Sequence, residues 1–324
     1  MELSKKLKTA VIGAGNIGFH HCRNYFQSEL CEFIGVYDSD SNQLKKVKEA
    51  FNCYLFSNLD ELIQQKPDAV SICVPTHLHY QVAKKCLENG IHCLVEKPLS
   101  TDLNEIDELI DLAAKKNLVL TVGQIERFNP AVKQLKEIIE TGILGEIVNI
   151  VAKRVGGYPP SLSETGVYFD LAVHDLDIIL YLLNEEPEKV TTHKLSIFNS
   201  KVDDASSVFI QFKRASAFIQ VNWITPVKIR TLSVTGTKGY AELNFIDQKI
   251  ELFERNADPE NFEEKDFHEF LYKFSNPQKK LIQPNKQEPL KNELEHFIKV
   301  INKEEELVVK PEQVLQTMKW LMKS

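Results

Sequence analysis

Long hydrophobic runs are missing from this sequence. No uninterrupted apolar stretch among its 324 residues approaches the roughly 18–20 residues that a membrane-spanning helix needs. Residues 1–7 contain no apolar signal core, and the first apolar run, residues 9–12, leads directly into glycines. We therefore expect neither a membrane span nor secretion, and we predict a cytoplasmic protein.

Cysteine is scarce and unevenly placed. The six cysteines all lie in the first 93 residues, and no pair has the C-x-x-C spacing; they are Cys22, Cys31, Cys53, Cys73, Cys86 and Cys93. This scatter does not favour a disulfide framework, so we expect reduced thiols that pack as small hydrophobic side chains. His77 and His79 have the spacing of a metal-binding pair, but no acidic or cysteine partners accompany them, and we expect no metal site.

Positive charge does not dominate the composition either. The 46 Asp and Glu exceed the 39 Lys and Arg, which gives a formal net charge of −7. This balance argues against a protein that binds nucleic acid or a membrane surface, although it allows a local site for a single nucleotide. The composition, 43% hydrophobic and 26% charged, is that of a globular protein, and the length predicts about two domains.

Strand and helix patterns alternate over residues 1–122. Predicted strands cover 8–13, 32–38, 53–56, 68–74, 92–96 and 118–122, and predicted helices cover 18–26, 42–50, 59–64, 79–89 and 103–116. The strands are almost continuously apolar, which indicates burial on both faces. We therefore predict an α/β domain over residues 1–122, built on a doubly wound parallel sheet.

The pattern changes after residue 122. Helices are predicted at 130–141, 169–183, 292–301 and 311–322, and strands at 146–155, 190–198, 206–213, 217–224, 229–235, 240–245 and 249–253. Consecutive strands separated by turns predict an antiparallel meander. We expect a second, α+β domain over residues 123–324, with an open-faced, mostly antiparallel sheet and helices on one face. The polar segment 255–290, with four prolines, is predicted as a long excursion without an assigned role.

A glycine-rich turn follows the first predicted strand. Its G-x-G-x-x-G pattern consists of Gly13, Gly15, Asn16, Ile17 and Gly18 around Ala14. It opens a helix, and Asp38 ends the next strand about twenty residues on. The glycines let backbone N–H groups approach a pyrophosphate, and Asp38 would accept hydrogen bonds from the adenosine ribose. A carboxylate there repels a 2′-phosphate, so we predict NAD rather than NADP; the alternative is a glycine turn of an unrelated α/β sheet.

A second polar group follows the strand at 68–74. Pro75, Thr76 and His79 come directly after it, and the carboxyl ends of strands line the ligand crevice of a doubly wound sheet. We predict that these residues contact the cofactor. The alternative is that Pro75 and Thr76 only start the next helix, with Thr76 as its cap.

A third polar group, Glu96, Lys97 and Pro98, follows the strand at 92–96. The ammonium group of Lys97 at such a site can polarise a hydroxyl group or a developing carbonyl oxygen. The alternative is an ordinary lysine at a strand end, which is a solvated surface cation.

A fourth group lies at the start of the predicted helix 169–183. Asp170 and His174 are four residues apart and therefore share one helix face. Histidine titrates near neutral pH, which suits His174 to act as a general base, with Asp170 or Asp177 orienting it. The alternative is structural, because carboxylates favour helix N-termini and a single histidine in such a helix usually serves packing.

These elements, in this order, resemble the glucose–fructose oxidoreductase/inositol dehydrogenase/rhizopine catabolism (Gfo/Idh/MocA) family. The resemblance covers essentially the whole chain, including the turn at 236–239 that is typical of the second sheet. It implies a Rossmann domain followed by an open-faced sheet domain that often mediates dimers or tetramers. It also implies Lys97, Asp170 and His174 as the catalytic residues. We include Glu96 and Gln124 among the predicted cofactor contacts.

Residues 122–132 supply the substrate prediction. The segment is similar to that of the UDP-N-acetylglucosamine 3-dehydrogenases, although those members commonly carry His where Gln124 stands. The predicted substrate contacts are Lys97, Arg127, Asn129 and His174. The alternative for Asn129 is a helix start, with Asn129 as the cap and Pro130 as the first residue.

The sequence thus predicts an NAD-dependent sugar dehydrogenase that oxidises a secondary hydroxyl of a nucleotide-sugar, most specifically UDP-N-acetylglucosamine at C3, to the 3-keto sugar. His174 would take the hydroxyl proton, Asp170 would orient His174, and Lys97 would stabilise the developing oxyanion. The alternatives are a dehydrogenase of a free sugar or inositol that uses NAD or NADP, and a dinucleotide-binding regulatory protein. The expected partners are the small substrate and further copies of the chain, in a homodimer or homotetramer.

Overall fold

The computed structural model describes residues 6–158, 166–198, 201–255 and 278–323. The chain forms two compact units, one of residues 1–128 with 287–319 and the other of residues 129–286 with 320–324. The expected division at residue 122 differs from this grouping, since residues 123–128 and 287–319 pack with the first unit.

Hydrophobic burial explains why a C-terminal segment joins the first unit. Helix α9 (Pro289–Ile301) buries Leu294, Phe297 and Ile298 in the same cluster as Val11 and Cys22 of the N-terminal sheet and its first helix. The amphipathic pattern of this helix was visible in the sequence. Which sheet it covers was not, because periodicity identifies an apolar face but not its partner.

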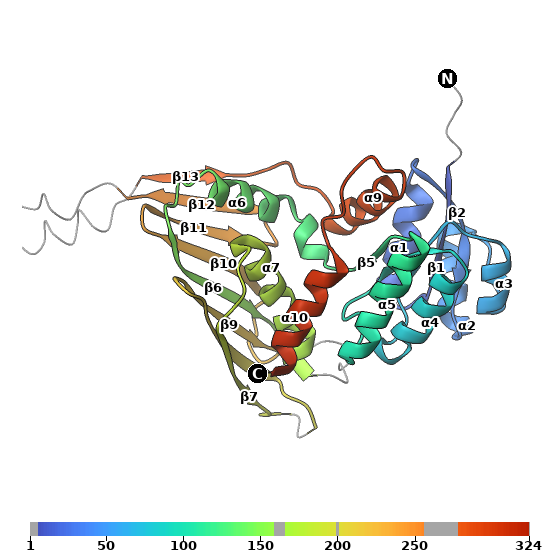
Figure 1. Ribbon diagram of the computed structural model, residues 1–324, viewed down its shortest axis with the longest axis horizontal. Helices are drawn as coiled ribbons and strands as arrows, with labels where there is room; N and C mark the ends of the chain where they lie inside the picture. Colours follow the sequence, from blue (N-terminus) through green and yellow to red (C-terminus); the bar gives the residue numbers. More distant parts are fainter. Residues whose placement is uncertain (1–5, 159–165, 199–200, 256–277, 324) are drawn as a thin grey trace, which may run out of the picture. The chain divides into compact units, whose positions relative to one another are not determined.

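The first unit contains a five-stranded parallel sheet in the order β2-β1-β3-β4-β5. The strands are β1 (Leu7–Ile12), β2 (Cys31–Tyr37), β3 (Ala69–Ile72), β4 (His92–Val95) and β5 (Leu120–Val122). Helices α1 (Asn16–Gln27), α2 (Ser41–Phe51), α3 (Leu59–Gln64), α4 (Thr76–Glu88) and α5 (Leu103–Lys116) connect them, as Figure 1 shows. The predicted doubly wound parallel sheet is confirmed. The predicted strand at 53–56 is reduced to a single bridge between Val36 and Leu55.

The strand order places a crevice between β1 and β3. The chain runs from β1 outward to β2 and then returns to β3 on the other side of β1. Ligands of doubly wound sheets bind at such a reversal, outside the carboxyl ends of the strands. Backbone hydrogen bonds join three strand ends there: the Gly13 N–H donates to the carbonyl oxygen of Tyr37 at the end of β2, and the Cys73 N–H donates to that of Ile12 at the end of β1.

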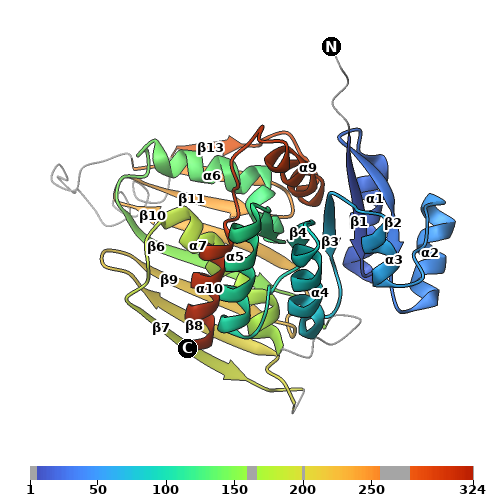
Figure 2. The same ribbon diagram turned by 45° about the vertical axis from the view of Figure 1, so that its right-hand side comes forward.

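The second unit contains an eight-stranded sheet in the order β13-β12-β11-β10-β6-β9-β8-β7, and Figure 2 shows these strands side by side. The strands are β6 (Ile147–Val155), β7 (Lys189–Leu195), β8 (Ala205–Gln211), β9 (Ser216–Asn222), β10 (Ile229–Gly236), β11 (Gly239–Asn244), β12 (Lys249–Glu254) and β13 (Lys279–Ile282). The predicted mostly antiparallel sheet is confirmed.

The predicted continuous meander is wrong at one place. Strand β6 lies between β9 and β10 and pairs with β9 in parallel, with Ala152 opposite Ile219. Its inward residues Ile150 and Ala152 are fully buried, so this strand fills the centre of the sheet. The predicted meander placed β10 directly beside β9. In the structure β6 separates these two strands and pairs with both of them.

Helices cover one face of this sheet. They are α6 (Pro130–Glu140), which contacts β11 and β12, and α7 (Val173–Leu183), which contacts β6 and β9. Side chains on the opposite face are more exposed: Val151 by 38%, Phe209 by 51% and Phe218 by 36%. Phe218 lies directly opposite both others in the strand register. The prediction of an open-faced sheet with helices on one face is therefore confirmed.

The remaining expectations concern the C-terminal third and the cysteines. Part of the predicted excursion at 255–290 forms β13, which pairs with β12, while its residues 256–277 lie outside the described ones. Helix α10 spans Pro311–Lys323. All six cysteines are buried free thiols. No helix within the described ranges is long and apolar enough to cross a membrane.

Candidate functional site

The glycine-rich turn after β1 is too tight for side chains at two positions. Gly13 has a φ of +95°, and a Cβ there would lie 2.5 Å from the carbonyl oxygen of Cys73. A Cβ on Gly18 would lie 2.0 Å from the carbonyl oxygen of Gly13. A Cβ on Gly15 would meet nothing within 4 Å, so this glycine opens space beside the turn. The glycines therefore have two roles: Gly13 and Gly18 permit the fold of the turn, and Gly15 leaves room for a ligand.

The N-terminus of α1 has the features of an anion site. Gly15 is its N-cap residue, and no side chain of this residue caps the first N–H groups of the helix, at Asn16 and Ile17. Backbone N–H groups and the helix dipole at such a terminus favour phosphate. The predicted roles of Gly15, Asn16 and Ile17 at a pyrophosphate are consistent with this geometry.

Asp38 lies beside the glycine turn at the end of β2. One carboxylate oxygen accepts a hydrogen bond from the N–H of Ala14, and the other accepts one from the N–H of Asp40 at 2.7 Å. These bonds fix the carboxylate at the rim of the turn. A ribose hydroxyl placed there would meet an oriented acceptor, whereas a phosphate would meet a negative charge.

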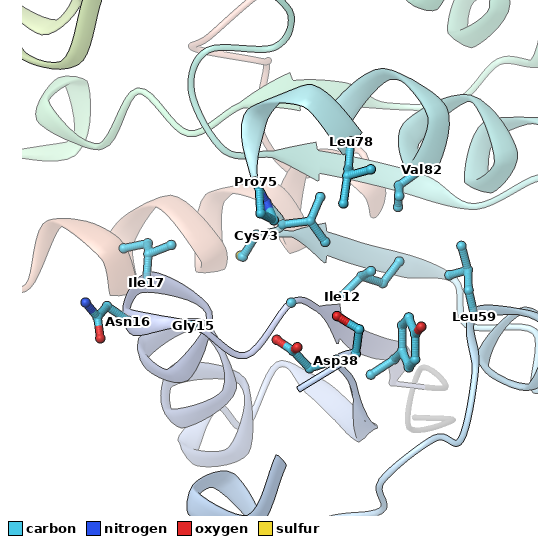
Figure 3. Close-up of a pocket in the computed structure, with 14 residues that line it drawn as sticks. Ile12, Gly15, Asn16, Ile17, Asp38, Leu59, Cys73, Pro75, Leu78 and Val82 are labelled. Atoms are coloured by element: carbon cyan, nitrogen blue, oxygen red, sulfur yellow. The ribbon is translucent and has the colours of Figure 1, made fainter. Parts of the chain in front are cut away.

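A cavity of about 670 Å³ opens at the turn. Its lining includes the predicted Gly13, Gly15, Asn16, Ile17, Asp38 and Pro75. Figure 3 shows Leu78 and Val82 of α4 and Leu59 on the apolar side of this space, with Asp38 across from them. The glycine turn, the carboxylate and an apolar slot match the pyrophosphate, ribose and adenine of a dinucleotide. The residues present therefore fit NAD.

Several lining residues were not predicted from the sequence: Ile12, Tyr37, Ser39, Leu59, Cys73, Val74, Leu78 and Val82. Leu78 and Val82 had a usable signal, because their spacing of four places them on one face of the helix that follows Pro75. Cys73 and Val74 directly follow β3, and they line the cavity because they lie where the strand order reverses. Burial raises the pKa of the Cys73 thiol well above its ordinary value, with a further contribution from Glu96, so this thiol stays protonated.

Thr76 and His79 do not lie among the cavity-lining residues. Thr76 is the first residue of α4, and Pro75 is its N-cap, so the alternative prediction of Thr76 as the cap is wrong. His79 is 1% exposed and lies between two loops, with Nδ1 2.7 Å from the carbonyl oxygen of Pro98 and Nε2 2.8 Å from that of Val74. Burial lowers the pKa of His79. The histidine thus ties the loop after β3 to the loop that carries Lys97.

Lys97 follows β4 and is half-buried. Glu96 carries the hydrogen bonds that hold this strand end: its Oε1 lies 3.0 Å from Nε2 of His21, and its Oε2 accepts from the Lys97 N–H at 3.3 Å. Burial raises the pKa of Glu96, but the hydrogen bond with His21 and the positive charge of Lys97 outweigh burial, so the pKa of Glu96 is lowered overall. The predicted cofactor contact of Glu96 stays a prediction, while its contacts with His21 and Lys97 are structural.

Gln124, Arg127 and Asn129 are all buried. The amide nitrogen of Gln124 has no hydrogen-bond partner among the described residues, which suits a group that faces a ligand. Arg127 donates through Nη1 to Val308 O at 3.1 Å and to Gln313 at 2.7 Å. These contacts were not predicted, because Val308 and Gln313 lie 181 and 186 residues along the chain from Arg127.

Asn129 begins α6. Its side-chain oxygen accepts from the N–H of Ala131 at 3.1 Å, and its amide donates to Phe245 O at 3.1 Å. Pro130 is the first helical residue. The helix-start alternative for Asn129 and Pro130 is confirmed, and the substrate contacts predicted for Arg127 and Asn129 stay predictions.

Asp170 and His174, in the second unit, lie on either side of a change in helix type. Residues Tyr168–Ala172 form a π-helical turn, and α7 continues from Val173. The predicted continuous helix 169–183 is therefore interrupted. Such π-turns occur frequently at functional sites, because the wider turn redirects side chains without ending the helix. Both residues are half-buried.

Asp203 anchors the start of this helix. Its side chain accepts from the N–H of Tyr168 at 2.7 Å, and its backbone oxygen accepts from Val167 at 2.9 Å. Gly166, with a φ of +74°, lets the chain pass, since a Cβ there would lie 2.3 Å from the Asp203 side chain. Asp203 was not predicted, because it lies in a loop more than thirty residues along the chain from the helix that it anchors.

Comparisons with known proteins identify the family. A model of the oxidoreductase family with an NAD-binding Rossmann fold, Gfo/Idh/MocA, matches residues 7–124, and a model of the Gfo/Idh/MocA C-terminal domain matches residues 132–242. The chain belongs to the Gfo/Idh/MocA oxidoreductase family. The coarse prediction of an oxidoreductase with a dinucleotide-binding Rossmann fold is thereby confirmed.

Two characterised relatives illustrate the chemistry of this family. UDP-N-acetylglucosamine 3-dehydrogenase of Acidithiobacillus ferrooxidans is 30% identical over 78% of this chain and 78% of its own. Myo-inositol 2-dehydrogenase of Thermotoga maritima is 28% identical over 62% of both chains. Both relatives are dehydrogenases, one of a nucleotide-sugar and one of a polyol.

Two solved structures share the fold of this chain. The structure of the Acidithiobacillus ferrooxidans enzyme matches with a TM-score of 0.85 at 24% identity, over 98% of this chain and 96% of its own. GenD2 from gentamicin A biosynthesis, solved in complex with NAD, matches with a TM-score of 0.81 at 19% identity, over 99% and 94%. Across the ranges that the structure describes, no group of three or more His, Cys, Asp or Glu could hold a metal ion.

Proposed function

We propose that this protein is an NAD-dependent dehydrogenase that oxidises a secondary hydroxyl of a nucleotide-sugar, most specifically the C3 hydroxyl of UDP-N-acetylglucosamine, to the 3-keto sugar. The observation that carries the proposal is the 30% identity, over 78% of both chains, to a UDP-N-acetylglucosamine 3-dehydrogenase. The presence of Lys97, Asp170 and His174 at the predicted catalytic positions supports it.

NAD is the proposed cofactor, and NADP is disfavoured. Gly13, Gly15 and the N-terminus of α1 would hold the pyrophosphate, and the oriented carboxylate of Asp38 would bind the adenosine ribose. A 2′-phosphate beside Asp38 would meet like-charge repulsion. When bound, NAD supplies the hydride acceptor for the reaction.

The protein's own residues supply the acid–base chemistry. His174 takes the proton of the substrate hydroxyl, and Asp170 orients His174. The Lys97 ammonium stabilises the negative charge that develops on the same oxygen as the proton leaves. The hydrogen bond that the Lys97 N–H donates to Glu96 holds the lysine backbone, which limits the entropy lost when substrate binds.

Oxidation of a free sugar or inositol is the second candidate. The 28% identity to a myo-inositol 2-dehydrogenase favours it, since the same trio of residues would serve a hydroxyl without a nucleotide. A regulatory protein that only binds a dinucleotide is the third, and it would have no use for Lys97, Asp170 and His174 together.

A homodimer or homotetramer is the proposed assembly. The exposed aromatic residues Phe209 and Phe218 lie opposite each other on the uncovered face of the eight-stranded sheet, and apolar surface of this kind favours association. Light scattering of the purified chain measures the assembly. Replacement of Phe218 by Asp should shift it toward the monomer, and an unchanged mass would contradict the use of this face.

The decisive experiment is cofactor reduction with a panel of substrates. UDP-N-acetylglucosamine, other UDP-sugars, free sugars and inositols are each tested with NAD and NADP. Activity with UDP-N-acetylglucosamine and NAD supports the first candidate, activity only without the UDP group supports the second, and binding of NADH without turnover of any substrate supports the third.

Lys97→Ala and His174→Ala test the catalytic assignment. Each should lower kcat by about 10²-fold or more, as expected for the loss of a general base or an oxyanion donor, while NADH binding stays near native. Lys45→Ala, at an exposed lysine of α2, is the control. Near-native turnover in both test variants would refute the assignment.

A further inference from the structure

Helix α9 carries a buried carboxyl group inside the first unit. Glu293 is 2% exposed, and neither of its carboxyl oxygens has a hydrogen-bond partner among the residues that the structure describes. Its helix neighbours Leu290, Leu294 and Phe297 belong to the main hydrophobic cluster of this unit. An ionised carboxylate is strongly disfavoured in such surroundings unless it is paired, so Glu293 is held as the neutral acid.

Glu96 is the charged neighbour of Glu293. Burial raises the pKa of Glu293 well above its ordinary value, and the negative charge of Glu96 raises it further. Glu96 itself has two donors, His21 and the Lys97 N–H, and is ionised. Of these two carboxyl groups in one low-dielectric region, Glu293 is therefore protonated and Glu96 is ionised.

His21 is hydrogen-bonded to one of the two carboxyl groups, that of Glu96. It is fully buried, with Nε2 3.0 Å from Glu96, and its Nδ1 has no hydrogen-bond partner within the described part of the chain. It is one helical turn before Tyr25 on α1, and α1 packs against α9. Glu293 acts electrostatically on Tyr25, one turn from His21 on α1, and on Glu96, the hydrogen-bond partner of His21, so its carboxyl group belongs to the region around His21.

The hydrogen-bonding capacities of the two orphaned groups are complementary. Because Glu96 is an acceptor, Nε2 of a neutral His21 must carry the ring proton, and Nδ1 is then an acceptor. A neutral carboxyl group has one O–H donor. The two groups are not in direct hydrogen-bond contact, and a buried water commonly joins such a pair.

We propose that Glu293 is a positioning residue for Lys97: its O–H donates through an internal water to Nδ1 of His21 and thereby holds His21 in the tautomer that donates Nε2–H to Glu96. Glu96 then accepts from the Lys97 N–H and fixes the start of the lysine loop. The importance of this series of hydrogen bonds for catalysis rests on the proposed function of Lys97. The tautomer of His21 is independent of that function.

Nitrogen NMR of the full chain, labelled with ¹⁵N-histidine, tests the tautomer directly. The His21 signals are assigned by their loss in His21→Gln. In the native protein and in E293Q, whose amide retains a donor of similar shape, His21 should be the Nε2–H tautomer. In E293M, which keeps the volume but removes the donor, the Nδ1–H tautomer should appear.

Kinetics test the positioning role. E293M should lower kcat by about tenfold, as expected for the loss of a buried hydrogen bond, with less than a threefold change in the KM for NAD, and E293Q should restore kcat. Glu295→Gln, at a partly exposed position of the same helix, is the matched control and should change neither quantity. An absence of dehydrogenase activity in the native protein would refute the proposed function. The NMR measurement of the His21 tautomer would still test the role of Glu293.

A second measurement keeps the proposal testable if E293M does not fold. The infrared carbonyl band of a protonated carboxylic acid should be present in the native protein at neutral pH and absent in E293Q. A native His21 in the Nδ1–H or doubly protonated form, an unchanged tautomer in E293M, or the absence of the acid band would each overturn the proposal.

Discussion

The Nε atom of Arg154 donates to both carboxylate oxygens of Asp175, at 3.0 Å each, and Nη2 lies 2.9 Å from one of them. Both side chains are nearly fully buried. The pair joins β6 to α7 directly beside His174, so it fixes the helix that carries the proposed base. The guanidinium also stacks over the ring of Phe245, 5.0 Å from its centre.

Breaking this pair on one side should be strongly destabilising. Asp175→Asn and Arg154→Met should each reduce the free energy of unfolding by about 3–5 kcal/mol, because a buried charge is left without its partner. The double variant with Met at 154 and Leu at 175 should recover most of that loss. Thermal unfolding measures the effect.

The exposed pair Arg214 and Glu146 provides the control for this experiment. Arg214→Ala should cost about 1 kcal/mol or less, because both side chains are more than 70% exposed. Equal costs for Arg154→Met and Arg214→Ala would contradict the structural role of the buried pair.

Two glycines of the same turn should respond differently to alanine. Gly18→Ala forces a methyl group onto the carbonyl oxygen of Gly13, so the variant should lose stability as well as NADH binding. Gly15→Ala places its methyl group in open space, so the protein should fold with near-native stability and still bind NADH about tenfold or more weakly. Fluorescence titration with NADH and thermal unfolding separate the two effects. Native affinity in Gly15→Ala would place the pyrophosphate elsewhere.

Asp38→Ala should weaken the preference for NAD. The loss of a charge-assisted acceptor should raise the KM for NAD by about tenfold, and the loss of the negative charge should improve the use of NADP. Asp40→Ala removes the capping side chain of α2 two residues away and is the control. The ratio of kcat/KM for the two cofactors is the measurement, and an unchanged ratio in Asp38→Ala would remove the basis for choosing NAD.

The stability difference between native protein and Glu293→Gln should depend on pH. Below the pKa of an unfolded glutamate, about 4.3, both folded and unfolded chains hold the Glu293 proton. Above it the unfolded chain releases the proton while the folded chain keeps it, because the folded pKa is raised. The native protein therefore loses up to about 1.4 kcal/mol of stability per pH unit, from near pH 5 up to the folded pKa.

Glutamine does not titrate, so Glu293→Gln should become progressively more stable than the native protein as the pH rises from 5 to 8. Thermal unfolding at several pH values measures the difference between the two chains. A difference that stays constant over this range would mean that Glu293 ionises normally in the folded protein.

Local patterns predicted most of the elements of the fold. The apolar strands and the glycine turn determined the parallel sheet, because burial on both faces leaves a continuous hydrophobic signal. Long-range partners were not predictable in the same way. Pro289–Ile301 has a clear apolar face, yet only the three-dimensional structure shows that Phe297 belongs to the same hydrophobic cluster as Val11.

The same limit explains which site residues were anticipated. Gly13 and Gly18 belong to a short motif of neighbouring residues, and Asp38 lies at the end of the strand that directly follows the next helix, so all three could be located from the local order of elements. Arg127 offered a charge near a predicted domain boundary, and its contacts with Val308 and Gln313 depend on the C-terminal segment. A buried charged residue such as Arg127 needs partners, and tertiary packing rather than sequence spacing decides which residues these are.

The position of β6 has a consequence for the order in which the second sheet forms. Strands β7 to β9 and strands β10 to β12 each pair with their neighbours in sequence, so each set can assemble as local hairpins. Neither set pairs with the other except through β6, which precedes both in the chain. Closure of long loops makes such pairings slow. The sheet should therefore be completed late, when β6 enters between two preformed ribbons, and a nascent chain would expose two unpaired edges until it does.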